Sequence, residues 1–415
     1  MNSLLLSAAG SSRRSRVATI VAVAVLGAAV ALPPDALAAR RHHAAAASAT
    51  SAPAASGAEP QGDYTEACVL EPVSNPFIFE RNDDAPWPTA SLAKMMVMLI
   101  VAEKLHDGSL KLTDQVATSR AAAKMGGSQV YLKEGETFSL DDTMKAIAVH
   151  SANDSTVAVA EYIAGSADAF VQMMNQKAAA LGMKNTHYYF VHGLPPGPGQ
   201  QADVSSAHDE AVLGRELVKY PDVLRWTSIT TAPFRNGTFL LQNTNHLVFT
   251  YKGCDGLKTG FYDKAGFNVV ATAKRGDLRL IAVVLGTVHK PANFRTAGEL
   301  MSQGFLNYEM RSIAKKGSQV PQTVAVIDGT APSLKPVFGG DAEVFTKRDD
   351  DSKSARALKV AYNLPPSVTA PVKAGQQIGT AKVTQDGKPV ATVALLAPAS
   401  VPRETSIVKR LLSRF

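Results

Sequence analysis

Two residues near the start of a strongly apolar stretch have the types and spacing needed to make a nucleophile. Ser91 and Lys94 are three residues apart at the beginning of Thr89–Glu103, TASLAKMMVMLIVAE. In a helix, side chains three apart lie on one face, so the serine hydroxyl would meet the lysine amine. Burial favours neutral lysine, and a neutral amine can accept the proton of an adjacent hydroxyl. The pair therefore predicts a serine activated for attack on a carbonyl.

Ser-x-x-Lys is a common spacing, and this chain also has it at Ser312/Lys315 and Ser406/Lys409. Spacing alone therefore does not identify a catalytic pair. The pair Ser91/Lys94 differs because it opens a stretch that is hydrophobic on nearly every side, which is typical of a helix in the middle of a domain. Two further polar segments follow it at intervals of about 60 and 107 residues: Ser151-Ala152-Asn153 and Lys258-Thr259-Gly260.

The side chains of these two segments suit the same reaction. The Ser151 hydroxyl can relay a proton to a leaving amine, and the Asn153 amide can hold a peptide backbone. The charge of Lys258 would bind a carboxylate and favour neutral Lys94 by repulsion. Taken singly, Ser151 and Asn153 could cap a helix, and Lys258 could be a surface lysine. The three segments in this order favour one shared site.

The backbone near the third segment also suits a substrate. Gly260 has no side chain, so a substrate can approach that strand edge closely. The backbone N–H groups of Ser91 and Phe261 are the expected donors to an oxyanion. A further polar residue, His192, is expected to be structural rather than a general base, because nothing in the sequence pairs it with an acid.

The composition indicates an ordinary globular protein with more than one domain. The chain has 415 residues, of which 46% are hydrophobic and 19% charged, so it is neither a disordered chain nor a coiled coil. The formal net charge of +7 favours contact with anionic surfaces such as a membrane or a cell-wall polymer. No segment resembles a nucleic-acid-binding module, so nucleic acid is not an expected partner.

The N-terminus has the pattern of an export signal. The basic segment Arg13–Arg16 precedes the apolar run Val17–Leu32, and Ala36–Ala38 offers small residues for cleavage. Residues 1–38 are therefore a predicted signal peptide for the general export route, and residues 39–63 a flexible linker rich in Ala, Ser and Pro. The mature protein is expected in the periplasm or peripherally on the outer face of the cytoplasmic membrane.

The two cysteines leave two alternatives open. Cys68 and Cys254 both lie in apolar segments that are predicted to be strands. An exported protein occupies a compartment that permits a disulfide. The distance between the two residues does not follow from the sequence, so a disulfide and two buried thiols both remain possible.

Hydrophobic periodicity predicts the remaining elements. Two strands are expected before the apolar helix, on either side of the turn Ser74–Pro76. Later helices are expected at 141–150, 155–164, 167–181, 206–218 and 294–308. Neighbouring antiparallel strands are expected at 253–258, 267–273 and 278–285. From about Ser318, short strands alternate with Gly, Pro and Asp turns, which indicates a small all-β domain.

These elements predict a catalytic domain over 64–316, a β-rich domain over 317–402 and a tail over 403–415. If the tail is helical, its basic residues lie opposite an apolar face made of Ile407, Val408, Leu411, Leu412 and Phe415. Such a helix tends to lie in a membrane interface, with its cations toward anionic headgroups. The alternative is that the tail packs on its own β-domain or frays.

The three polar segments resemble those of the low-molecular-mass penicillin-binding proteins that are serine D-alanyl-D-alanine carboxypeptidases. The resemblance runs from about Ala67 to Val401 and includes KNTHYYFVHGL, the NTN of Asn243–Asn245 and CDGLKTGFYDKAGFNVVATAKRGDLRLIAVVLG. It implies a penicillin-recognising α/β (α+β) fold. In that fold an antiparallel five-stranded sheet carries helices on both faces, and a small all-β domain follows.

The resemblance also implies the reaction. The enzyme would remove the terminal D-alanine from peptidoglycan pentapeptide stems through an acyl-serine intermediate, without metal, nucleotide or other cofactor. β-Lactam antibiotics would acylate the same serine. Carried over residue by residue, the catalytic residues would be Ser91, Lys94 and Ser151. The substrate-binding residues would be Asn153, Lys258, Thr259, Gly260 and Phe261.

Three positions depart from the family pattern. The second segment is Ser-Ala-Asn rather than Ser-Asp-Asn, Phe261 stands where some relatives have His, and Asn293 where many have Arg. A β-lactamase shares these motifs but needs fast deacylation, which in class A enzymes relies on a dedicated glutamate; no counterpart is identified in this sequence. A D,D-endopeptidase would differ only in substrate. A non-catalytic wall-binding protein is least favoured, because all the motif residues are present.

Overall fold

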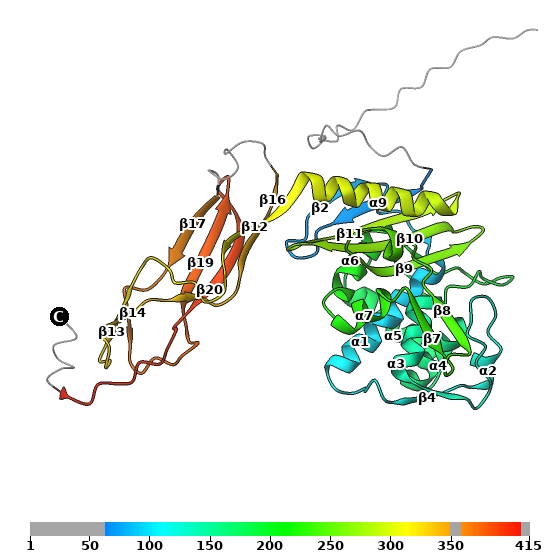
Figure 1. Ribbon diagram of the computed structural model, residues 1–415, viewed down its shortest axis with the longest axis horizontal. Coiled ribbons are helices and arrows are strands. Elements are labelled where there is room, and N and C mark those ends of the chain that lie inside the picture. Colours follow the sequence, from blue (N-terminus) through cyan, green and yellow to red (C-terminus); the bar gives the residue numbers. More distant parts are fainter. Residues whose placement is uncertain (1–62, 349–357, 408–415) are drawn as a thin grey trace, which may run out of the picture. The chain divides into compact units, whose positions relative to one another are not determined.

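The computed structural model describes residues 63–348 and 358–407. The predicted signal peptide and nearly all of the predicted linker lie outside these residues, as does the tail beyond Ile407. The described chain begins with an α/β part, and a part made only of strands follows it (Figure 1).

A five-stranded antiparallel sheet with the strand order β2-β1-β11-β10-β9 forms the centre of the α/β part. Two strands come from before the apolar helix and three from near the end of this part, which confirms the predicted strands. The strands are β1 (Glu66–Leu70), β2 (Phe77–Arg81), β9 (Cys254–Tyr262), β10 (Gly266–Arg275) and β11 (Leu278–Thr287). β9 lies at an edge of the sheet, so the strand that carries Lys258, Thr259 and Gly260 has one side without a partner strand.

Helices cover both faces of this sheet, as predicted. Because successive side chains of a strand point to opposite faces, Leu280 and Ala282 of β11 pack against α9 (Lys290–Asn307). Ile281 and Val283 face the larger core that contains the apolar helix. Figure 1 shows α9 on one side of the sheet and the other long helices on the opposite side.

The apolar stretch forms a 3₁₀ turn, η1 (Ala90–Ala93), that runs directly into α1 (Lys94–His106). Residues 95–102 are all buried, so this helix is surrounded by the larger core. The prediction of one continuous α-helix from Thr89 is therefore wrong in its first turn. In a 3₁₀ turn the side chains at i and i+3 eclipse, which brings Ser91 and Lys94 onto one edge.

The other helices of the α/β part lie in the larger core, except the last of them, whose Leu247 lies in the core that also contains the α9 residues. They are α2 (Arg120–Ala123), α3 (Leu140–His150), α4 (Asn153–Ala164), α5 (Ala167–Ala180), α6 (Ala207–Leu217), α7 (Pro221–Thr227) and α8 (Leu247–Thr250). Short strand pairs connect them: β3 (Trp87–Pro88) with β6 (Val204–Ser205), β4 (Gln115–Ala117) with β5 (Thr137–Ser139), and β7 (Thr231–Phe234) with β8 (Phe239–Gln242).

The largest corrections to the predicted boundaries concern α9 and β9. α9 begins at Lys290 rather than 294, because Pro291 occupies its first turn, where a residue without an N–H costs nothing. β9 continues to Tyr262, so Lys258–Gly260 lies within a strand rather than at its end. The reason is pairing with β10, which extends to Gly266 opposite Tyr262.

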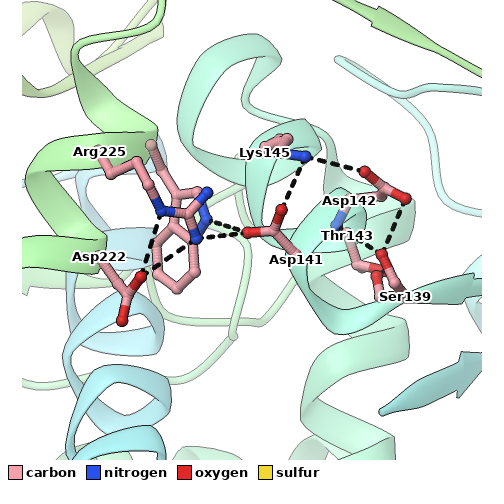
Figure 2. Close-up of polar contacts among 8 residues, drawn as sticks. Ser139, Asp141, Asp142, Thr143, Lys145, Asp222 and Arg225 are labelled. Carbon is pink, nitrogen blue, oxygen red and sulfur yellow. Dashed lines mark hydrogen bonds and ion pairs between the residues drawn. The ribbon is translucent and has the colours of Figure 1, made fainter. Parts of the chain in front are cut away.

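Charged contacts fix the start of α3, the helix that carries Ser151 at its other end. Asp141 accepts a hydrogen bond from Arg225 Nη2 of α7 at 2.6 Å and pairs with Lys145 at 2.7 Å. Figure 2 shows the Asp141 carboxylate between these two cations. Burial raises the pKa of Asp141. The hydrogen bonds from Arg225, Lys145 and Trp226 lower it by more than burial raises it, and the resulting pKa is about 2. The carboxylate is therefore ionised near neutral pH and ties α3 to α7.

The two cysteines are free thiols. Cys68 lies on β1 and Cys254 on β9, three strand spacings apart in the sheet, which is roughly 14 Å. Cα atoms joined by a disulfide lie within about 7 Å. Cys68 also packs in the larger core, whereas Cys254 contacts the core on the opposite face. The sequence allowed either a disulfide or two separate thiols, and in the structure the two thiols are separate.

The second part is made of strands alone, which confirms the predicted all-β character. It begins with β12, which pairs with β16, so it starts at Tyr308 and not at the predicted residue 317. Its strands are β12 (Tyr308–Ala314), β13 (Val324–Ile327), β14 (Ser333–Leu334), β15 (Val337–Phe338), β16 (Ala342–Lys347), β17 (Leu358–Asn363), β18 (Ser367–Thr369), β19 (Gln377–Gln385) and β20 (Lys388–Leu396). They form the sheets β14-β13-β18 and β15-β20-β19-β17 and the pair β12-β16. Two small apolar cores, around Val324 and around Phe338, hold them together.

Candidate active site

The predicted meeting of Ser91 and Lys94 is present in the structure. Lys94 Nζ lies 2.9 Å from Ser91 Oγ and donates a hydrogen bond to the backbone carbonyl of His192 at 2.5 Å. Lys94 is fully buried, whereas Ser91 is partly exposed. A hydroxyl that a ligand can reach therefore stands directly against an amine that water cannot reach.

Burial changes the acid–base properties of both lysines at the site. It lowers the pKa of Lys94 well below its ordinary value, and the nearby charge of Lys258 lowers it further, while Asp203 raises it. Burial alone lowers the pKa of Lys258 to about 7. Removing an ammonium from water disfavours its charged form, and a second cation nearby adds to the cost. Of the two lysines, Lys94 is therefore the one whose neutral form is favoured both by burial and by a neighbouring cation.

The loop that supplies the His192 carbonyl packs tightly on the segment carrying Ser91. Gly193 has φ +72°, and a Cβ atom there would lie 1.9 Å from the carbonyl oxygen of Ala90. The His192 ring accepts a hydrogen bond from the backbone N–H of Leu194 at 3.0 Å. Burial lowers the pKa of His192 to about 4, and the charge of Lys94 acts in the same direction. The ring thus makes a hydrogen bond within its own loop. The sequence did not indicate that the backbone carbonyl of His192 would face Lys94.

β9 also packs closely on the segment that carries Ser91. A Cβ atom on Gly260 would lie 2.5 Å from the carbonyl oxygen of Thr89 and 3.1 Å from the backbone nitrogen of Ser91. Only glycine allows this approach, so Gly260 is needed for packing as well as for access. Lys258 Nζ donates to the backbone carbonyl of Thr259 at 2.7 Å.

The NTN segment supports β9 through Thr244. The hydroxyl of Thr259 donates to the Thr244 hydroxyl at 2.8 Å. The amides on either side of Thr244 bind backbone carbonyls: Asn243 Nδ2 donates to Ile229 at 2.7 Å, and Asn245 Nδ2 to Gly256 at 3.0 Å. The three motifs did not predict that Thr244 would contact the site. The only signal in the sequence was that Asn243–Asn245 forms part of the family resemblance.

Ser151 and Asn153 do not cap a helix with their side chains. Ser151 ends α3 with φ +63°, and Asn153 begins α4, whose N-cap Ala152 makes no side-chain hydrogen bond. Asn153 Nδ2 donates instead to the carbonyl of Gly126 at 2.7 Å. A Cβ atom on Gly127 would lie 2.9 Å from both Asn153 Nδ2 and Leu194 Cδ2. The Ser151–Asn153 segment and the His192 loop are therefore neighbours.

Two positions that depart from the family pattern have definite surroundings. Phe261 follows Gly260 on β9, is 51% exposed and stacks on Phe267 with 4.1 Å between ring centroids. Asn293 is buried in the first turns of α9, where its Oδ1 accepts from the backbone N–H of Phe294. Phe261 is thus an exposed apolar surface beside the site, whereas the Asn293 side chain is used within its own helix.

The fold and the contact between Ser91 and buried Lys94 define a penicillin-recognising serine peptidase. The chain belongs to the D-alanyl-D-alanine carboxypeptidase family: the family model with that description, peptidase family S11, matches residues 53–289. The model of the penicillin-binding protein 5 C-terminal domain matches residues 308–403. The family and the activity predicted from the sequence are confirmed.

Named relatives agree with this assignment. The chain is 34% identical over 328 residues to the D-alanyl-D-alanine carboxypeptidase DacF of Bacillus subtilis, covering 78% of this chain and 82% of that protein. It is 34% identical to DacC of Escherichia coli, covering 82% and 86%. The crystal structure of penicillin-binding protein 5 from Haemophilus influenzae matches with TM-score 0.65 and 28% identity, covering 84% of this chain and all (100%) of that one. The ampicillin-bound form of penicillin-binding protein D2 from Listeria monocytogenes matches with TM-score 0.55 and 30% identity, covering 60% and 100%.

The contact between Gly193 and Ala90 gives a test of the site's packing. In Gly193→Ala the new methyl group would occupy the position of the Ala90 carbonyl, so the Ser91 segment or the His192 loop must move. We expect the second-order rate of acylation by benzylpenicillin to fall roughly tenfold or more, because displacements of about 1 Å have such effects.

Gly108→Ala is the matched control for this test. Gly108 has φ +81°, so the backbone strain is similar, but nothing lies within 4 Å of a Cβ atom there. We expect this variant to lose about 1 kcal/mol of stability and to keep its acylation rate. Equal acylation rates in Gly193→Ala and Gly108→Ala would contradict the packing described above.

Proposed function

We propose that the enzyme releases the terminal D-alanine of peptidoglycan pentapeptide stems in two steps at Ser91. Ser91 Oγ attacks the carbonyl of the penultimate D-alanine, an ester forms, and the C–N bond to the terminal D-alanine breaks. Water then hydrolyses the ester and regenerates the serine. The observation that carries this proposal is the 2.9 Å contact between partly exposed Ser91 Oγ and fully buried Lys94 Nζ.

Lys94 takes the proton of Ser91 in the first step. A neutral amine has two N–H bonds and one lone pair. One N–H donates to the His192 carbonyl at 2.5 Å, and Nζ lies 2.9 Å from Ser91 Oγ, so the lone pair can take the serine proton when it faces that hydroxyl. As the serine oxygen bonds to the substrate carbon, its O–H bond breaks and a third N–H bond forms on Lys94.

Ser151 and Lys258 act on the departing D-alanine. Ser151 relays the proton from Lys94 to the leaving nitrogen. Lys258 binds the free carboxylate of the substrate, and because its pKa is lowered to about 7, the arrival of that carboxylate favours its charged form. Protonated Lys258 in turn favours a neutral Lys94, so carboxylate binding prepares the base.

The remaining site residues hold the substrate backbone. Gly260 lies on the free edge of β9, where an extended peptide can pair as an added strand. Thr259 and Asn153 supply polar side-chain groups to that backbone. Backbone N–H groups of Ser91 and Phe261 stabilise the oxyanion. The exposed ring of Phe261 gives an apolar contact to the stem where some relatives have an imidazole.

β-Lactams acylate the same serine, since their ring amide mimics the D-alanyl-D-alanine bond. A β-lactamase would hydrolyse that ester quickly with a dedicated acid. In the described part of the chain, the hydrogen bonds of Ser91 and Lys94 run to each other and to His192, and not to a carboxylate. We therefore expect a long-lived penicillin adduct. A D,D-endopeptidase activity on cross-linked stems would use the same residues and is decided by comparing the two substrates.

Replacement of the nucleophile is the direct test of this function. Ser91→Ala should release no D-alanine from a pentapeptide and should not be labelled by a fluorescent penicillin, because no oxygen remains to form the ester. Both are measured against the wild-type protein, with a thermal midpoint to show that the variant is folded. Undiminished D-alanine release by Ser91→Ala would sink the assignment.

The two lysines can be separated by the same substitution. Lys94→Arg should be nearly inactive, because arginine does not give up its proton and cannot act as a base. Lys258→Arg should retain more activity, since only a positive charge is asked of that position. The measurement is kcat/KM for D-alanine release, and equal losses in the two variants would refute the separate roles.

The enzyme is proposed to act outside the cytoplasm, on the outer face of the cytoplasmic membrane. Residues 1–38 would direct export, and the tail 403–415 would lie in the membrane interface with the β-rich domain as a spacer. Within the parts of the chain that the structure describes, no helix is both long and apolar enough to cross a bilayer. The support for a peripheral tail is its sequence: apolar residues on one helical face and basic residues toward the other.

Truncation after Ile407 tests the tail without disturbing the domain before it. Arg403 pairs with Asp328 at 3.7 Å, and the backbone N–H of Glu404 donates to the carbonyl of Asp328, so both contacts remain. We expect carboxypeptidase activity to persist and the protein to move to the soluble fraction. The full-length variant Leu411→Asp/Leu412→Asp should also be released, since its apolar face is lost. Truncated protein that still sediments with membranes in high salt would exclude the tail as the anchor.

A further inference from the structure

Asp203 is a buried carboxylate between the two segments that meet at the Ser91–Lys94 pair. It is 3% exposed and immediately precedes β6. Its Oδ1 accepts hydrogen bonds from the backbone N–H groups of Tyr189 at 2.6 Å and Phe190 at 2.9 Å. Its backbone carbonyl accepts from the N–H of Thr89 at 3.1 Å. One residue thus binds the loop leading to His192 on one side and the start of the nucleophile segment on the other.

We propose that Asp203 is a positioning residue for the reaction, holding the His192 carbonyl against Lys94 and supplying the negative charge that stabilises protonated Lys94. This inference rests on the proposed function, in which Lys94 is the base. None of the three motifs includes Asp203, and the role proposed for it is indirect: it contacts the backbone around the catalytic pair and not the substrate.

The mechanical part of this role follows from the short chain between the contacts. Only Val191 separates the anchored Phe190 from His192, and Gly193 is pressed against Ala90. The loop is therefore held on both sides of the carbonyl that receives the Lys94 N–H. Losing the Asp203 acceptor would leave the part-buried backbone N–H groups of Tyr189 and Phe190 without this partner, which is unfavourable, and the loop could relax away from Lys94.

The electrostatic part follows from which charged groups face Lys94. Three titratable groups face Lys94: Lys258 on β9, the ring of His192, and Asp203. Lys258 lowers the pKa of Lys94, and Asp203, the carboxylate among them, raises it. Asp203 Oδ2 is buried and has no hydrogen-bond partner among the described residues, so its charge is not cancelled by a direct contact. Burial raises the pKa of Asp203 to about 6, while its two backbone hydrogen bonds and Lys94 lower it. Tyr262 of β9 also faces this carboxylate.

The benefit arises when the proton moves. Lys94 becomes an ammonium in a dry site beside Lys258, which is unfavourable for two positive charges. A fixed carboxylate within the same site offsets this cost as the charge develops, as preorganised groups do for other transition states. It also keeps Lys94 basic enough to take the serine proton, because a base that is too weak transfers protons poorly.

Two substitutions separate the two parts of the role. Asp203→Asn keeps an oxygen that can accept from Tyr189 and Phe190 but removes the charge, whereas Asp203→Ala removes both. The readout is the second-order rate of acylation by benzylpenicillin across pH, together with the thermal midpoint. Glu210→Gln is the matched control, because Glu210 is a fully buried carboxyl group on neighbouring α6 that does not act on Lys94.

In Asp203→Asn the rising, acidic limb of the pH profile should move to lower pH by about one unit, because loss of the carboxylate lowers the pKa of Lys94. The alkaline limb should stay in place, since burial alone sets the pKa of Lys258. Asp203→Ala should lose roughly tenfold or more in rate at every pH, with a larger loss than Asp203→Asn. Glu210→Gln should keep both limbs.

Each result decides one part. An acidic limb that does not move in Asp203→Asn overturns the electrostatic role. Wild-type acylation by Asp203→Ala overturns the positioning role. If that variant does not fold, Asp203→Ser, whose hydroxyl is one bond too short to reach both N–H groups, replaces it in the same measurement. Ser91→Ala, measured in parallel, separates failure of the proposed function from failure of the Asp203 proposal. Acylation of Ser91→Ala would refute the proposed function itself. If Ser91→Ala is not acylated and the acidic limb of Asp203→Asn does not move, only the electrostatic role of Asp203 is refuted.

Discussion

The structure depends most on the removal of one lysine side chain from water. Lys94 begins a helix that is buried on all sides, and its amine has only Ser91 and the His192 carbonyl as hydrogen-bond partners in the described structure. A buried ammonium is costly, so the same apolar packing that stabilises the domain lowers the pKa of this amine and favours its neutral form. The core and the proposed base therefore depend on a single helix.

Other parts of the α/β fold serve to close this site around Ser91. The 3₁₀ turn brings the serine over the lysine, Gly193 lets one loop approach closely, and Gly260 lets β9 approach closely. Each approach is closer than any side chain would allow. The edge position of β9 then leaves a free strand edge beside the nucleophile, which suits an extended peptide.

Much of this was predictable because it is encoded locally or in recognisable motifs. Apolar periodicity located the buried helix, and the motifs located Lys258 and Asn153. The sequence did not indicate that the carbonyl of His192 would accept a hydrogen bond from Lys94. It also did not indicate that Asp203 would bind the backbone of the loop that contains His192. Such contacts use backbone atoms, which every residue has, and join segments about 100 residues apart in the chain. The separation of Cys68 from Cys254 likewise follows only from strand order.

The central claim is that Lys94 is neutral at the pH at which the enzyme works, and side-chain NMR of lysine tests it most directly. The Lys94 signal would be assigned by its absence from the folded Lys94→Arg variant and followed across pH in the protein without substrate. We predict titration well below the ordinary lysine pKa of about 10.4. Titration of Lys94 at that ordinary value would contradict the account.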